Sequence, residues 1–139
     1  MTAVSATLDV RNFAATPGDG YTNTTASNGA TYCYKYSGGT DGNGNVEVIT
    51  ETGTLTFTVT VGLDPRYTIY DVQFSGDTSS DMSWTWGNIP LNNIAVIVDT
   101  DTSNETAYCN IIVQDRTAQC TFPCDPKIIN KPPAPPVNA

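Results

Sequence analysis

The chain has 139 residues, with 14 acidic and 6 basic side chains, no histidine and a formal net charge of −8. Phosphate binding needs a basic surface, so this balance argues against a nucleic-acid partner. The lack of histidine excludes histidine-based catalytic triads and histidine-ligated metals. The length predicts one domain that is large enough to bury a core.

The sequence leaves the cellular compartment open. No apolar run is long enough to span a bilayer, so we predict no membrane insertion. Residues 1–5 have neither the basic segment nor the apolar segment of a secretory signal. The composition, poor in lysine and rich in threonine and asparagine, nevertheless resembles that of extracellular or surface β proteins. A surface assembly and a cytoplasmic protein therefore both remain open.

Runs of alternating apolar and polar residues predict β-strands along the whole chain. Residues 16–30 are expected to form a long loop, and no segment has the pattern of an amphipathic helix. The pattern predicts an all-β fold, an antiparallel β-sandwich of the immunoglobulin-like or jelly-roll-like kind with about eight or nine strands. The expected strands are Val4–Val10, Thr31–Ser37, Val46–Thr50, Thr54–Val61, Arg66–Phe74, Met82–Trp86, Ile94–Val98, Thr106–Val113 and Ala118–Phe122.

The strand Thr31–Ser37 carries a candidate nucleophile. Its three tyrosines alternate with Cys33 and Lys35, so the two sets point to opposite faces of the sheet. If Lys35 faces the core, loss of solvation lowers its pKa and makes its amine reactive. If the tyrosines pack in the core instead, Lys35 is an ordinary surface lysine.

The four cysteines are Cys33, Cys109, Cys120 and Cys124. An even number permits two disulfides, with three possible pairings. A turn over residues 114–117 would place Cys109 opposite Cys120 and predicts a cross-strand contact or bridge. Buried free thiols are the alternative. Zinc is disfavoured because no second close pair complements Cys120 and Cys124, and no cofactor is predicted.

Two further groups suggest chemistry. Asp99 and Asp101 end an apolar strand, where desolvation and mutual repulsion would raise their pKa values, so they are candidate catalytic carboxylates. The alternative is that they are solvated loop acids. Trp84 and Trp86, at strand spacing, fit either core packing or a glycan-binding platform.

The most informative stretch is Phe122–Lys127, which contains the bond between Asp125 and Pro126. The aspartate side chain can attack its own main-chain carbonyl, close a five-membered cyclic anhydride and expel proline. Water would then open the anhydride and complete cleavage, whereas a lysine amine would form an isopeptide bond. The chain has a second such bond, Asp64–Pro65, and an Asp-Pro pair can also simply begin a turn.

The segment from Cys124 to Asn130, with the strand before it, resembles the end of the DP-EP family. These are small bacterial β-sandwich proteins described as self-cleaving Asp-Pro endopeptidases. The resemblance covers the chain length, the all-β pattern and this motif. It implies a β-sandwich over residues 1–125 and self-cleavage between Asp125 and Pro126. Residues 126–139 would then be a C-terminal strand and proline-rich tail, docked on the same chain or on a neighbour.

The resemblance also implies an Asp–Lys isopeptide, a second aspartate that activates water, and self-assembly. No lysine occurs between Lys35 and Lys127. The acceptor would therefore be Lys35, or a lysine of another copy such as Lys127 or Lys131. Asp99 and Asp101 are the candidates for the activating aspartate, by location alone.

Three functions follow from these features. The first is single-turnover self-processing at Asp125–Pro126, with covalent self-assembly if a lysine of another copy captures the acyl group. The second is a non-enzymatic structural subunit of a filament, phage particle or cell surface that assembles by inserting the strand around Ile128 into a neighbour. The third is a glycan-binding module. Whether the protein is an enzyme stays open, and the expected partner is another copy of itself.

Overall fold

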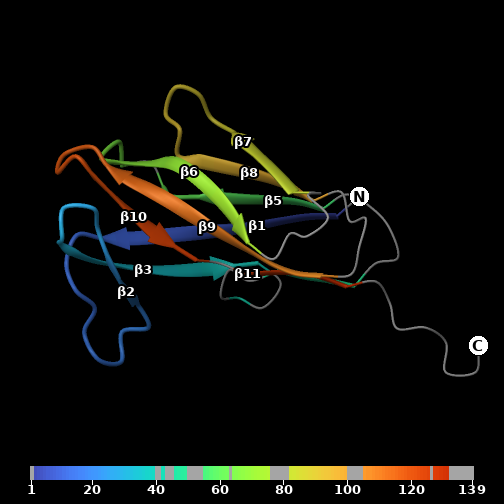
Figure 1. Ribbon diagram of the computed structural model, residues 1–139, viewed down its shortest axis with the longest axis horizontal. Helices are drawn as coiled ribbons and strands as arrows, with labels where there is room; N and C mark the ends of the chain where they lie inside the picture. Colours follow the sequence, from blue (N-terminus) through green and yellow to red (C-terminus); the bar gives the residue numbers. More distant parts are fainter. Residues whose placement is uncertain are drawn as a thin grey trace, which may run out of the picture.

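The computed structural model describes residues 2–39, 42, 46–49, 55–62, 64–75, 82–99, 105–125 and 127–131. These residues form an all-β fold of two sheets (Figure 1), which confirms the predicted fold class. Within them, no helix is long and apolar enough to cross a membrane. The strands are β1 (Thr2–Arg11), β2 (Thr22–Thr25), β3 (Thr31–Gly38), β4 (Val46–Ile49), β5 (Leu55–Thr60), β6 (Tyr67–Ser75), β7 (Met82–Trp86), β8 (Ile94–Asp99), β9 (Glu105–Asp115), β10 (Cys120–Cys124) and β11 (Lys127–Lys131).

One sheet has the strand order β2-β3-β1-β5-β8-β7. All its pairings are antiparallel except that between β1 and β5, which is parallel. The alternation read from the sequence matches the burial, because Leu8, Phe57 and Val59 are all fully buried on the inner face. The polar residues between them lie on the other face of the sheet.

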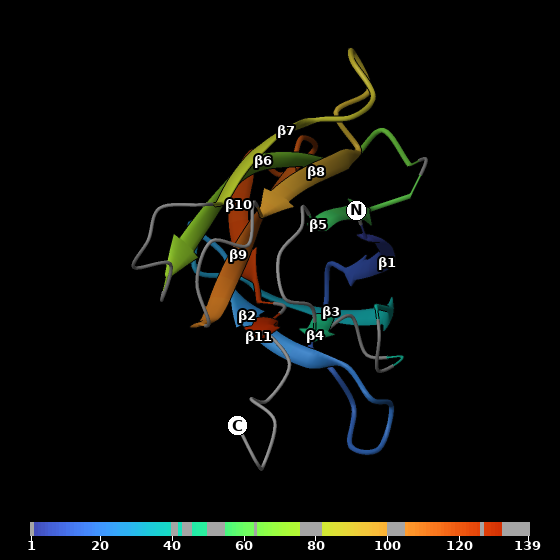
Figure 2. The same cartoon turned by 90° about the vertical axis from the view of Figure 1, so that its right-hand side faces the viewer.

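The other sheet is built around β9, which pairs with β6 along one edge. Both β10 and β11 pair with the opposite edge of β9, one after the other. On its far side β11 also pairs with β4, in a parallel arrangement. The strand β11 therefore lies between β4 and β9, as Figure 2 shows near the C-terminal end of the described chain.

The core lies between the two sheets, where apolar side chains of both meet. Tyr32 of β3 stacks on Phe122 of β10, with ring centroids 4.4 Å apart and planes inclined by 19°. Ile69, Ile111 and Val113 fill the same layer from β6 and β9. The tyrosine face of β3 thus packs against β10, the strand that leads to Asp125.

An ion pair between a buried aspartate and a partly exposed arginine holds the turn between β9 and β10. Asp115 is fully buried, and Arg66 donates two hydrogen bonds to it, from Nε at 2.9 Å and from Nη2 at 2.8 Å. Tyr32 Oη donates a third at 2.5 Å, and the backbone N–H groups of Thr117 and Ala118 donate two more. Burial opposes ionisation of Asp115, but the bonds from Arg66 and Tyr32 outweigh it and hold its pKa at about 2.

Three details differ from the sequence prediction. Residues 22–25, expected in a loop, form the edge strand β2. Two strand pairings are parallel, whereas a purely antiparallel sandwich was expected. The turn after β9 occupies residues 116–119 rather than 114–117, because Asp115 accepts the N–H groups of the turn and so marks the end of β9. That shift changes every cross-strand partner in the hairpin.

Candidate functional site

The candidate site is the junction between β10 and β11, where Asp125 follows the last residue of β10. Cys124 is paired with Ile111 of β9, and Lys127 is paired with Tyr108. From Cys124 to Lys127 the chain advances by three residues, and the partner position on β9 moves back by three, from Ile111 to Tyr108. β10 and β11 keep one register along β9, so the chain is held by backbone pairing on both sides of Asp125. Pro126 itself lies outside the described residues.

Two tyrosines from the opposite sheet contact the peptide unit just before the candidate bond. Tyr36 Oη donates a hydrogen bond to the Cys124 carbonyl at 2.8 Å. The Asp125 N–H donates a longer hydrogen bond, of 3.5 Å, to Tyr34 Oη. Tyr36 is buried and Tyr34 is half-buried. The sequence predicts a tyrosine face on β3, but not that this face lies against Cys124 and Asp125.

The Asp125 carboxyl has a shifted protonation equilibrium. The residue as a whole is exposed, yet partial desolvation raises the pKa of its carboxyl above the usual value. The neighbouring thiols are more deeply buried. Burial raises the pKa of Cys109 to about 12 and that of Cys124 well above its usual value, and the Asp125 charge adds to both shifts. The surroundings of Asp125 therefore favour the neutral acid.

Asn110 is a further polar residue that the sequence did not single out. The register places it across from Asp125, and the alternation of β9 directs it away from the core face of Cys109 and Ile111. Its side-chain Oδ1 is buried and has no hydrogen-bond partner. An amide oxygen accepts hydrogen bonds and the amide nitrogen donates them, so Asn110 fits either protonation state of a carboxyl group across from it.

Lys35 lies on the opposite face of β3 from the tyrosines that contact the Asp125 segment. It is exposed, and its Nζ lies 5.8 Å from the centroid of the Tyr21 ring on the outer side of the sheet. Lys35 is therefore an ordinary surface lysine, the second of the two alternatives for this residue. The structure does not place it near Asp125. The side chains of Lys127 and Lys131 lie outside the described residues.

The candidate carboxylates are only partly described. Asp99 ends β8 in the six-stranded sheet, where it is buried on the core face and paired with Leu55 and Met82. Asp125, by contrast, follows β10 in the other sheet. Asp101 lies outside the described residues. Across the described ranges, no three His, Cys, Asp or Glu side chains gather as metal ligands.

The second Asp-Pro pair has a different environment. The Asp64 carboxylate accepts the Arg66 N–H at 3.0 Å, and the Asp64 carbonyl accepts the Tyr67 N–H at 3.2 Å. These are the contacts of an aspartate that begins a turn. They tie both the attacking carboxylate and the carbonyl that it would attack to the following turn. Asp64–Pro65 therefore serves as an internal reference for Asp125–Pro126.

The four cysteines are buried thiols rather than members of disulfides. The expected contact between Cys109 and Cys120 is wrong, because Cys120 is paired with Asp115 and Cys124 with Ile111. The longer extent of β9 moves Cys109 beyond the end of β10. Cys33 faces the outer side of the other sheet, opposite Arg11 of β1.

We expect these thiols to be inert in the folded protein. Burial keeps reagents away from all four sulfur atoms, and for Cys33, Cys109 and Cys124 it also raises the pKa and so disfavours the thiolate, which is the form that reacts. Under non-reducing conditions a thiol reagent should therefore label none of the four within minutes in native buffer and all four in denaturant. A disulfide would be revealed by fewer than four labelled cysteines after denaturation.

Trp84 and Trp86 meet edge to face, with ring centroids 4.9 Å apart and planes inclined by 72°. Trp84 is half-buried against the core, and Trp86 Nε1 donates to the Ile69 carbonyl at 2.9 Å. The two rings therefore share no flat face of the kind that stacks on a sugar.

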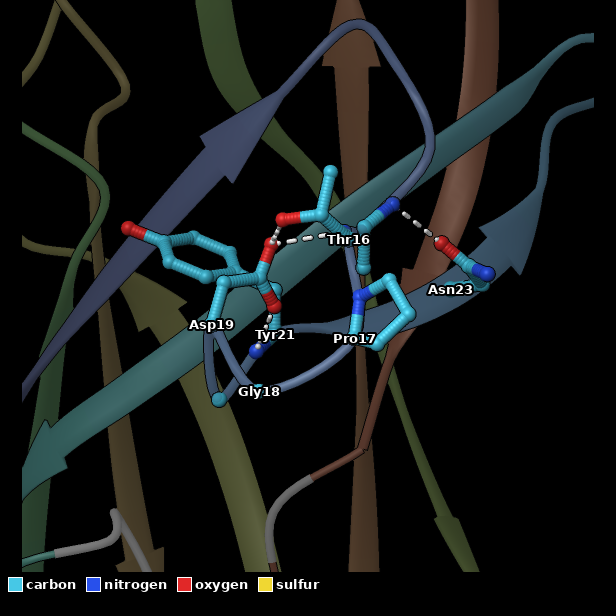
Figure 3. A pocket seen from close by; sticks show the side chains of 8 residues that line it. Thr16, Pro17, Gly18, Asp19, Tyr21 and Asn23 are labelled. Carbon is cyan, nitrogen blue, oxygen red and sulfur yellow. Dashed lines mark hydrogen bonds between the residues drawn. The ribbon is translucent and has the colours of Figure 1, made fainter.

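An open hollow of about 590 Å³ lies beside the loop before β2 (Figure 3). Asp19 organises this loop, because its carboxylate accepts bonds from the Thr16 N–H and hydroxyl and from the Tyr21 N–H. Asn23 accepts the Ala15 N–H from the other side. These polar groups are occupied in holding the loop. The hollow is lined by residues 15–21 and Asn23, of which Tyr21 lies beside Lys35 and not beside Asp125.

Of all these places, the junction at Asp125 alone combines a potential leaving group, a partly desolvated carboxyl and fixed backbone on both sides. A scan against protein-family models and a search of curated proteins both find no match to this chain.

Proposed function

We propose that this protein cleaves its own Asp125–Pro126 bond once. The observation that carries the proposal is the shared register of β10 and β11 along β9, which fixes the backbone on each side of the bond. A reaction within one residue gains most when rotation of the reacting groups is already restricted. The resemblance to the DP-EP family, read from the segment Cys124–Asn130, points to the same reaction.

The chemistry uses the acid form of Asp125. The side-chain oxygen attacks the Asp125 main-chain carbonyl carbon, the bond to the Pro126 nitrogen breaks, and the acid proton passes to that nitrogen. The products are a cyclic anhydride on Asp125 and a new N-terminus at Pro126. Water then adds to the anhydride and leaves two free carboxyl groups on Asp125. The raised pKa of Asp125 supports this route, because it keeps the reactive acid present at higher pH.

A lysine amine could replace water as the acceptor and leave an isopeptide bond on Asp125. Lys35 of the same chain is on the wrong face of β3 for this step. Within one chain, water rather than a lysine is therefore proposed to open the anhydride. Linkage would require a lysine of another copy, such as Lys127 or Lys131.

Cleavage would not free the C-terminal piece at once. β11 pairs with β9 on one edge and with β4 on the other, so residues 126–139 would stay bound after the cut. Mass spectrometry tests this after incubation of the purified protein. The proposal expects the full-length mass under native conditions, increased by one water, and separate 1–125 and 126–139 pieces under denaturing conditions. A single uncut species in denaturant would refute it.

The rate should fall as pH rises. The acid form of Asp125 is lost as pH rises through its folded-state pKa, and that pKa lies above the usual aspartate value. Cleavage should therefore be fastest below that pKa, as long as the protein stays folded, and should decline through a single titration as pH rises. A rate that increases with pH would contradict this acid route, because it would mean that the carboxylate form of Asp125 or another deprotonated group attacks the carbonyl. Measuring the 126–139 peptide by liquid chromatography at a series of pH values gives this profile.

Strand exchange between copies is the second candidate function. The same pairing favours it, because β11 lies between β4 and β9 and is connected to β10 through the Asp125–Pro126 segment. The position between β4 and β9 in one copy could accept β11 of another by strand addition. Mixing two chains of different tag size and measuring mixed oligomers by native mass spectrometry tests this, and an exclusively monomeric protein at high concentration would count against it.

A further inference from the structure

The peptide unit between Cys124 and Asp125 is bound at both of its polar edges by side chains of the other sheet. Its carbonyl accepts the Tyr36 hydroxyl at 2.8 Å, and its N–H contacts the Tyr34 oxygen at 3.5 Å. The Tyr36 bond is the shorter and the more buried of the two. It is therefore the main anchor of this peptide unit.

Anchoring matters here because Asp125 lies just outside the backbone ladder, which on this side ends at Cys124 and resumes at Lys127. Closing the anhydride requires the side-chain oxygen to approach the Asp125 carbonyl carbon through rotations about only two bonds of that residue. Because β11 holds the chain on the C-terminal side, a fixed peptide unit on the N-terminal side leaves the Asp125 main-chain carbonyl less freedom to turn away from this approach.

We propose that Tyr36 is a positioning residue for cleavage at Asp125–Pro126, an inference that rests on the proposed function. Its hydroxyl holds the Cys124 carbonyl and thereby orients Asp125 for attack on its own main chain. Tyr34 assists through the Asp125 N–H. Neither tyrosine transfers a proton or contacts the atoms that react.

The hydroxyl of Tyr36 remains a donor over the whole pH range in which cleavage is expected. Burial raises its pKa well above the usual tyrosine value, so it stays neutral. Its removal should therefore change how often Asp125 adopts the reactive geometry and leave the titration of Asp125 unchanged.

The test compares the variant Tyr36→Phe with wild type, and uses Tyr70→Phe, at an exposed tyrosine of β6, as the matched control. The cleavage rate is measured over a series of pH values, on protein shown by circular dichroism to be folded. Tyr36→Phe should cut more slowly by about tenfold, as expected for one lost hydrogen bond. The midpoint of its pH profile should not move, and the control should match wild type. Tyr34→Phe, which loses a longer contact, should be slowed by only about twofold.

A folded Tyr36→Phe that cuts at the wild-type rate would overturn the inference. So would a variant whose midpoint shifts to lower pH, because that result means that water has entered around Asp125 and that Tyr36 acts through packing. If Tyr36→Phe does not fold, an unchanged rate in folded Tyr34→Phe would also overturn the inference, and a slower rate at the same midpoint would support it. A wild-type chain that is never cut is a different result, since it removes the proposed function itself.

Discussion

Replacing Asp125 by alanine is expected to abolish cleavage between residues 125 and 126. The proposed reaction takes its nucleophile from this side chain, and water alone lacks the high effective concentration of a neighbouring carboxyl. The rate should fall by at least about a hundredfold. Denaturing mass spectrometry after a long incubation should therefore show only the full-length chain. Because Asp125 is exposed and forms no part of the core, the melting temperature should change little.

Two matched variants sharpen this prediction. Asp64→Ala removes the carboxylate of the other Asp-Pro pair and should leave cleavage at residue 125 unchanged. Asp125→Glu keeps a carboxyl but requires a larger ring, so its rate should lie well below that of wild type. Cleavage that persists in Asp125→Ala would show that another group attacks the bond and would contradict the anhydride route.

The second large effect concerns stability. Arg66→Met should destabilise the fold by about 3 kcal/mol, because Asp115 would remain fully buried without its charged partner. For a domain of this size the melting temperature should fall by roughly 10 °C. Arg116→Met, at an exposed arginine of the adjacent turn, is the control and should melt close to wild type. Equal melting of the two variants would show that the ion pair contributes nothing.

The same ion pair predicts sensitivity to acid. The pKa of Asp115 is lowered to about 2 in the folded state, so its stabilising effect is fully present above the unfolded-state pKa and is lost as pH falls toward 2. The contribution is roughly 2 kcal/mol. Wild type should therefore lose stability between about pH 4 and pH 2. In Arg66→Met the loss should be smaller, which a urea titration at each pH can measure.

The sequence predicted the strands well because their period-two patterns follow directly from burial on one face. Phe57, Val59 and Leu8 are buried as their alternation indicates. The edge strand β2 was missed, because its residues Thr22–Thr25 carry no apolar alternation and pair only with β3. An edge strand can be held by backbone hydrogen bonds to a single neighbouring strand and does not need an apolar face. Its sequence can therefore resemble that of a loop.

The candidate site was predictable only in its chemistry. The Asp125–Pro126 bond is visible in the sequence, whereas the position of Lys35 depends on which face of β3 meets the core. Cys33 is buried, but on the face of β3 that points away from that core. Its burial therefore does not mean that Lys35, on the same face, points into the core. The contact of Tyr36 with the Cys124 carbonyl joins residues 88 positions apart in different sheets, and no local pattern encodes such a pairing.

We propose that the fold, rather than the dipeptide itself, makes one bond reactive. The two Asp-Pro pairs of this chain allow a direct test. The protein is incubated at pH 5, folded in buffer and unfolded in urea, and the cuts at residues 64 and 125 are timed by mass spectrometry. We expect cleavage at residue 125 alone in the folded chain, and slow, comparable cleavage at both bonds in the unfolded chain. Equal rates at both bonds in the folded chain, or faster cleavage at residue 125 in urea, would contradict it.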